Sequence, residues 1–76
     1  MNNLKEIKIN NEYIKASQLL KLANVISQGY EAKFYIKDGL VKLNGKVISE
    51  RGKKVYPNDI LSISIEGAVI NIKVVN

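Results

Sequence analysis

The fold can be placed from one segment, Val41-Lys42-Leu43-Asn44-Gly45-Lys46-Val47. Apolar residues alternate with lysines on either side of the Asn-Gly pair, as they do in half-buried strands. Asn and Gly both tolerate the positive φ that two-residue hairpin turns require. The segment therefore predicts a β-hairpin whose turn is Asn44-Gly45.

Two helices are predicted before this hairpin. Apolar residues recur at helical spacing from Ala16 to Ile26, and a second amphipathic stretch spans residues 30–38. Residues 27–29 separate the two, and Gly39 is placed to end the second helix in the left-handed conformation. The apolar faces of these helices are expected to include Leu22, Val25, Ala32, Phe34, Tyr35 and Ile36.

Alternating apolar residues predict further strands, at about residues 4–9 before the helices and at 61–65 and 70–74 after the hairpin. Residues 49–56 are polar and basic, which favours a loop, and Pro57-Asn58-Asp59 predicts a turn. The 76 residues are expected to form one α+β domain, with two helices packed on a small, mostly antiparallel sheet.

Composition excludes several classes of function. The chain has neither cysteine nor histidine, which removes thiolate metal sites and the commonest general base. Its seven acidic residues are at least six positions apart, so no catalytic pair stands out. No apolar stretch is long enough for a signal peptide or a membrane span. We expect a cytoplasmic, non-catalytic monomer with no cofactor, metal, membrane partner or small-molecule substrate.

The positive charge is concentrated in one part of the chain. Residues 33–54 contain seven basic and two acidic residues, a net charge of +5, which equals the net charge of the whole chain. Such clustering is typical of proteins that bind polyanions. Lys33 and Lys37 are four positions apart and are expected on one side of the second helix. Lys42 and Lys46 of the hairpin are expected on the same continuous face, and the loop with Arg51, Lys53 and Lys54 is expected to border it.

Residues 31–46, EAKFYIKDGLVKLNGK, resemble the core of the RNA-binding domain first seen in ribosomal small-subunit protein S-four, also called the alpha-L motif. Pro57-Asn58-Asp59-Ile60 is similar to the Pro-Gly-Asp turn of that family, with Asn58 in place of glycine, and residues 14–22 match its first helix. The leading strand, the Arg-Gly-Lys-Lys run at 51–54 and the end at Val74-Val75-Asn76 resemble the small free-standing bacterial members of the YaaA type.

The resemblance implies that the protein binds structured RNA, such as ribosomal RNA or the ribosome, with its second helix against the phosphates. The expected contact residues are Lys33, Lys37, Lys42, Asn44, Lys46, Arg51, Lys53 and Lys54. Asn44 is also expected to form the turn. Many family members begin the second helix with Ser-Arg or Ser-Gly-Gly, whereas this chain has Ser27-Gln28-Gly29-Tyr30. A basic contact at that helix start is therefore missing.

Two other functions remain open from the residues alone. A ubiquitin-like interaction module has similar length and hairpins, although a sulfur carrier of that type needs a terminal Gly-Gly that is absent here. A DNA-binding protein would attract phosphates equally well, but no helix with base-reading side chains stands out. Tyr13 and Tyr56 are expected to pack within the fold, and either Tyr30 or Tyr35 is a candidate for base stacking.

Overall fold

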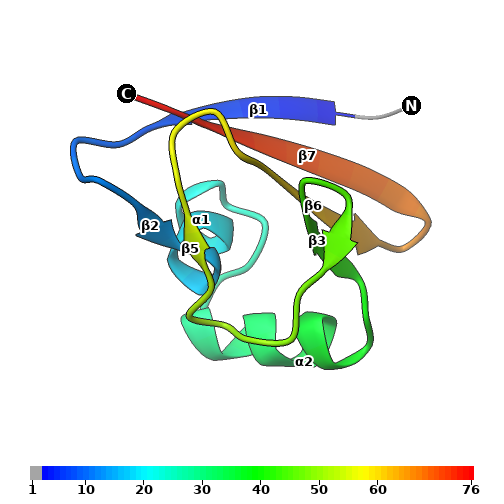
Figure 1. The fold of residues 1–76 in the computed structure, drawn as a ribbon. Helices are drawn as coiled ribbons and strands as arrows, with labels where there is room; N and C mark the ends of the chain where they lie inside the picture. The colour runs from blue at the N-terminus through cyan, green and yellow to red at the C-terminus, as the bar shows by residue number, and fades with distance from the viewer. Residues whose placement is uncertain (1–2) are drawn as a thin grey trace.

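The computed structural model describes residues 3–76 and contains two short sheets and two α-helices (Figure 1). The elements follow the order β1 (Asn3–Lys8), β2 (Ile14–Lys15), α1 (Ala16–Leu22), η1 (Gly29–Glu31, a 3-10 turn), α2 (Ala32–Lys37), β3 (Val41–Leu43), β4 (Lys46–Val47), β5 (Lys54–Val55), β6 (Ile60–Ile65) and β7 (Ala68–Val75). This confirms the expected α+β class.

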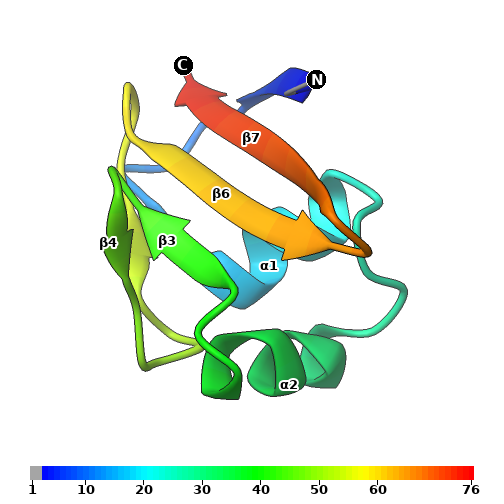
Figure 2. The same cartoon turned by 90° about the vertical axis from the view of Figure 1, so that its right-hand side faces the viewer.

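The main sheet has five strands in the order β1-β7-β6-β3-β4. Strand β1 runs parallel to β7, and every other neighbouring pair is antiparallel. Strands β2 and β5 form a separate antiparallel ribbon. Figure 2 shows α1 behind the main sheet and α2 below it, so one face of the sheet is left uncovered by helices. The prediction of two helices on a mostly antiparallel sheet is confirmed.

The core lies between α1 and the covered face of the sheet. Leu61 and Ile63 of β6 and Ile72 of β7 have no exposed surface, and they belong to the same cluster as Leu19 and Leu20 of α1. Each such side chain contributes about 1.5–3 kcal/mol through its removal from water. Because side chains alternate along a strand, the residues between them face outward.

The first helix is shorter than predicted. It ends at Leu22, whereas the apolar spacing suggested a helix as far as Ile26. Asn24 adopts a φ of 60°, which an α-helix cannot contain. Ile26 is nevertheless buried, so the spacing predicted its burial but not its conformation. Leu22 was also wrongly assigned to the apolar face, since 57% of it is exposed.

The second helix begins later than predicted. The 3-10 turn η1 precedes α2, which spans only Ala32–Lys37. Ala32 and Ile36 are buried as expected, but Phe34 is 56% exposed and does not join the core. Gly39 has a φ of +73°, which confirms its predicted left-handed conformation after the helix.

The loop predicted over residues 49–56 contains a strand that the sequence did not indicate. In it, β5 pairs with β2, which begins where the family resemblance suggested that the first helix starts. Ile14 and Val55 face the core across this ribbon. Two-residue strands are too short for alternation to be recognised, so sequence periodicity could not find them.

The predicted hairpin is confirmed. Asn44 and Gly45 have φ values of 50° and 87° and connect β3 to β4. The turn predicted at residues 57–59 also forms, with Asn58 at a φ of 77°. No helix in the described part of the chain has the length and apolar character needed to cross a membrane.

Candidate nucleic-acid interface

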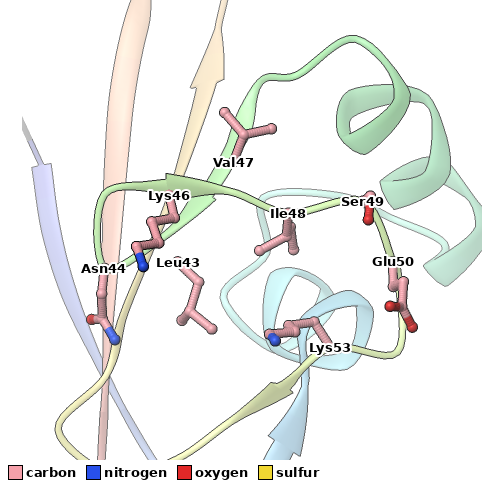
Figure 3. Close-up of a pocket in the computed structure, with 8 residues that line it drawn as sticks. All are labelled: Leu43, Asn44, Lys46, Val47, Ile48, Ser49, Glu50 and Lys53. Atoms are coloured by element: carbon pink, nitrogen blue, oxygen red, sulfur yellow. The ribbon is translucent and has the colours of Figure 1, made fainter.

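An open hollow lies between the β3–β4 hairpin and the segment leading to β5 (Figure 3). Leu43 and Ile48 provide its apolar floor, and both pack against or within the core. Lys46 borders it from the hairpin and Lys53 from the opposite side. The other lining residues are Asn44, Val47, Ser49 and Glu50. The hollow therefore carries two cations and one carboxylate above an apolar base.

A second hollow adjoins the first at Ser49, which lines both. It is bordered by Lys33 and Lys37 of α2 and by Arg51 of the loop, with Ile36 beneath them. We call the two hollows together the basic groove. Its five basic residues are Lys33, Lys37, Lys46, Arg51 and Lys53.

The helix side of the groove follows from the spacing of α2. Ala32 and Ile36 are buried, which leaves Lys33 and Lys37 exposed on the neighbouring side of the same helix. Gly39 then reverses the chain into β3, and the backbone N–H of Ile48 donates to the Val41 carbonyl oxygen at 3.1 Å. This bond extends the pairing within the hairpin, and Ser49, which follows it, lines the second hollow together with Lys33 and Lys37 of α2.

The loop side of the groove is fixed to the start of α1. The first backbone N–H groups of a helix have no partner within the helix. Here the N–H of Ala16 donates to the Lys53 carbonyl oxygen at 2.9 Å, and that of Ser17 donates to the Arg51 carbonyl oxygen at 3.1 Å. The basic loop therefore supplies hydrogen-bond acceptors for the backbone N–H groups in the first turn of α1. The same bonds fix the backbone of the loop.

Two of the predicted contact residues lie outside the groove. Lys42 lines neither hollow, because Val41 and Leu43 on either side of it face the core and alternation directs Lys42 to the uncovered face of the sheet. Lys54 instead places its Nζ 4.8 Å from the centre of the Tyr13 ring. The expectation that Lys42 shares one face with Lys33, Lys37 and Lys46 is therefore wrong.

Asn44 ties the hairpin to the turn before β6. Its side-chain amide donates to Asp59 Oδ1 at 3.1 Å, and its Oδ1 accepts from the Ile60 N–H at 3.0 Å. Asp59 Oδ2 also accepts from the Tyr56 N–H at 2.9 Å. Asn44 thus has a structural role at the end of the groove, and Asp59 holds its own turn through the Tyr56 N–H.

The Asn44→Ala variant should unfold about 10 °C below the unchanged protein. Alanine at this positive φ costs about 1 kcal/mol, and the lost hydrogen bonds cost about 1 kcal/mol more. Thermal unfolding followed by circular dichroism measures the change. The Asn44→Gly variant separates the two terms, because glycine accepts this φ and should lose only about half as much. Equal stability of all three proteins would contradict a stabilising role for Asn44.

Comparison with known proteins places this arrangement in a family. Residues 7–73 match the family model described as the S4 domain. The chain belongs to the S4 domain family. Within it, the chain is similar to the "Probable ribosome maturation protein RlbA" of Bacillus subtilis (strain 168), with 39% identity over 57 residues. The aligned region covers 75% of this chain and 80% of that relative. The resemblance inferred from residues 31–46 is thus confirmed.

Some residues of this S4 domain's groove were not anticipated. Leu43 and Ile48 form its floor, Ser49 joins its two parts and Glu50 adds a negative charge. Alternation from Val41 to Leu43 indicated a half-buried strand that includes Leu43, but nothing in the sequence indicated the burial of Ile48 or that Ser49 links the hairpin to α2. Among residues 3–76, no three of the side chains that commonly bind metals come close enough to hold an ion.

Proposed function

We propose that this S4 domain binds structured RNA, namely ribosomal RNA or the ribosome, through the basic groove and catalyses no reaction. The observation that carries the proposal is the convergence of five basic side chains from α2, the β4 strand and the following loop on two adjoining hollows. Lys37 and Arg51 are 14 positions apart in the sequence, and they line the same hollow only in the folded protein.

The groove suits phosphates better than base edges. Lysine and arginine contacts to phosphate supply most of the affinity of nucleic-acid binding and carry no sequence information. Arg51 adds the planar donor group that can bind two phosphate oxygens at once. The backbone hydrogen bonds accepted by residues 51 and 53 support this role, because they fix the backbone positions from which the two side chains extend. The RNA would therefore be selected by its shape.

We further propose a role in ribosome maturation, in the cytoplasm, with the protein acting as a monomer. The name of the Bacillus subtilis relative supports this role, and a maturation factor can act by binding alone. Lys42, Asn44 and Lys54 remain proposed RNA contacts: Asn44 lines the groove, whereas Lys42 and Lys54 lie outside it.

Affinity for a structured ribosomal RNA fragment should fall steeply as salt rises. If about four of the groove cations neutralise phosphates, the logarithm of the association constant falls with the logarithm of salt concentration at a slope of about −3 to −4. Fluorescence anisotropy with a labelled RNA hairpin measures the slope, at salt concentrations from about 50 mM to about 300 mM. An affinity that does not change with salt would contradict the proposal.

The same titration with a DNA hairpin of equal length separates the two nucleic acids. A-form RNA and B-form DNA differ in groove shape and in the 2′-hydroxyl, so a groove selected by shape should prefer the RNA hairpin. Equal affinities for the two hairpins would support the alternative that the protein binds DNA.

A further inference from the structure

The β2–β5 ribbon presents two tyrosines and two lysines on one exposed face. Lys15 pairs directly with Lys54 in the register of the ribbon. Tyr13 precedes Lys15 by two positions and Tyr56 follows Lys54 by two, so the tyrosines lie on the same side of the ribbon as the lysines. The two ring centroids lie 5.8 Å apart with the planes tilted by 50°. Ile14 and Val55, which lie between these residues along each strand, point to the core. We call Tyr13, Lys15, Lys54 and Tyr56 the tyrosine–lysine ribbon.

The pairing of Lys15 with Lys54 is unfavourable for the fold by itself. Like charges directly opposite each other on neighbouring strands are destabilising. Lys15 and Lys54 are both exposed, and 41% of Tyr56 is exposed, although both tyrosines were expected to pack within the fold. The carboxylate of Asp59, two positions beyond Pro57, is already hydrogen-bonded to Asn44 and to the Tyr56 backbone. Glu12 is the nearest acidic residue in sequence, and it is exposed.

The ribbon continues the basic groove. Lys53 lines the groove, whereas the next residue, Lys54, places its ammonium over Tyr13. The two lysines are consecutive in the chain, with Cα atoms about 3.8 Å apart, so the groove and the ribbon meet at this point of the backbone. A nucleic-acid strand bound at Lys53 would therefore lie close to the start of the ribbon.

We propose that the tyrosine–lysine ribbon binds an unpaired RNA segment that continues from the structured element held in the basic groove. Bases of this segment stack on Tyr13 and Tyr56, and its phosphates bind Lys15 and Lys54. The inference rests on the proposed function, because it assigns a second contact to the same RNA. Aromatic side chains beside a positively charged track are the usual means of holding single strands without sequence preference.

The chemistry favours a single strand over a duplex. In a duplex the bases are stacked on one another, so their faces are not available to a protein surface. The Lys54 ammonium now lies on the Tyr13 ring, and a cation–π contact at an exposed site is weak. It can therefore move to a phosphate when a base takes its place. Tyr56 offers a second ring for the neighbouring base.

The test compares two RNA probes, a blunt hairpin and the same hairpin extended by about four unpaired adenylates at either end, a length suited to a short single-strand site. The protein should bind the extended hairpin about tenfold more tightly than the blunt one. The Tyr13→Leu/Tyr56→Leu variant should lose this tenfold gain and keep its affinity for the blunt hairpin. The Tyr13→Phe/Tyr56→Phe variant should retain the gain, because the aromatic rings remain. Circular dichroism checks that each variant is folded.

Exposed Phe34, on α2 and outside the ribbon, provides the matched control, and Phe34→Leu should leave the gain unchanged. The proposal is overturned if the unpaired extension brings no gain in affinity, or if the Tyr13→Leu/Tyr56→Leu variant keeps that gain. Either result would leave the ribbon as a surface for a protein partner. A failure of the blunt hairpin to bind any form of the protein would refute the groove instead. The ribbon is then tested alone by a single-stranded adenylate oligonucleotide, which the leucine variant must bind more weakly.

Discussion

Reversing Lys33, Lys37 and Lys53 to glutamate should weaken binding to structured RNA by about 100-fold to 500-fold at 0.1 M salt. Each phosphate contact raises the affinity about fivefold to eightfold when salt falls from about 1 M to about 0.1 M, because counterions are released from the RNA. The variant removes three such contacts. All three side chains are exposed at the basic groove, so the fold should tolerate the changes. Fluorescence anisotropy measures the affinity, and circular dichroism confirms the fold.

The matched control reverses Lys5, Lys8 and Lys21, which are also exposed but lie outside the groove. Both triple variants change the net charge by the same amount, so long-range attraction falls equally in the two proteins. An equal loss of affinity in both would mean that overall charge, and not the groove, is responsible. An unchanged affinity in the groove variant would favour the interaction-module alternative.

Shortening Leu61 to alanine should destabilise the domain by about 2–5 kcal/mol. Leu61 lies on β6, the central strand of the main sheet, and has no exposed surface. A domain of this size has a total stability of about 4–11 kcal/mol, so the loss is a large share of it. Urea denaturation should show a lower midpoint with an unchanged slope.

The neighbouring Ile60 serves as the control for this change. It lies on the same strand but points to the uncovered face of the sheet and is 36% exposed. The Ile60→Ala variant should lose less than half as much stability as the Leu61→Ala variant. The reason is that folding removes less of the Ile60 side chain than of the Leu61 side chain from water. Equal losses would show that the uncovered face is packed against something in solution.

The sequence predicted those parts of the fold whose pattern extends over several residues. Alternation located β6 and β7, and the Asn44-Gly45 pair located the hairpin with the correct backbone conformation. Prediction from the sequence failed where the pattern was too short or was broken by a single residue. Strands β2 and β5 have two residues each, and the positive φ of Asn24 ends α1 within an apolar repeat that continues beyond it.

The candidate site was predicted in its charge but only partly in its geometry. The error at Lys42 could have been avoided, because a two-residue turn pairs residue 43 with 46 and residue 42 with 47. Lys42 and Lys46 therefore face opposite sides of any such hairpin. The position of Lys54 could not be found in this way, since it depends on the pairing of β5 with a strand about forty residues earlier.

The parallel pairing of β1 with β7 has a consequence for how the domain assembles. Asn3 is paired with Ile70, so the contact joins residues sixty-seven positions apart along the chain. Contacts between such distant residues require the closure of a long loop and slow the folding of a domain. Strand β7 is also the only neighbour of β1 among the described strands, while β6 can pair with β3 without it. During synthesis, the hairpin and the helices can therefore come together early, whereas β1 must wait for a partner that leaves the ribosome late.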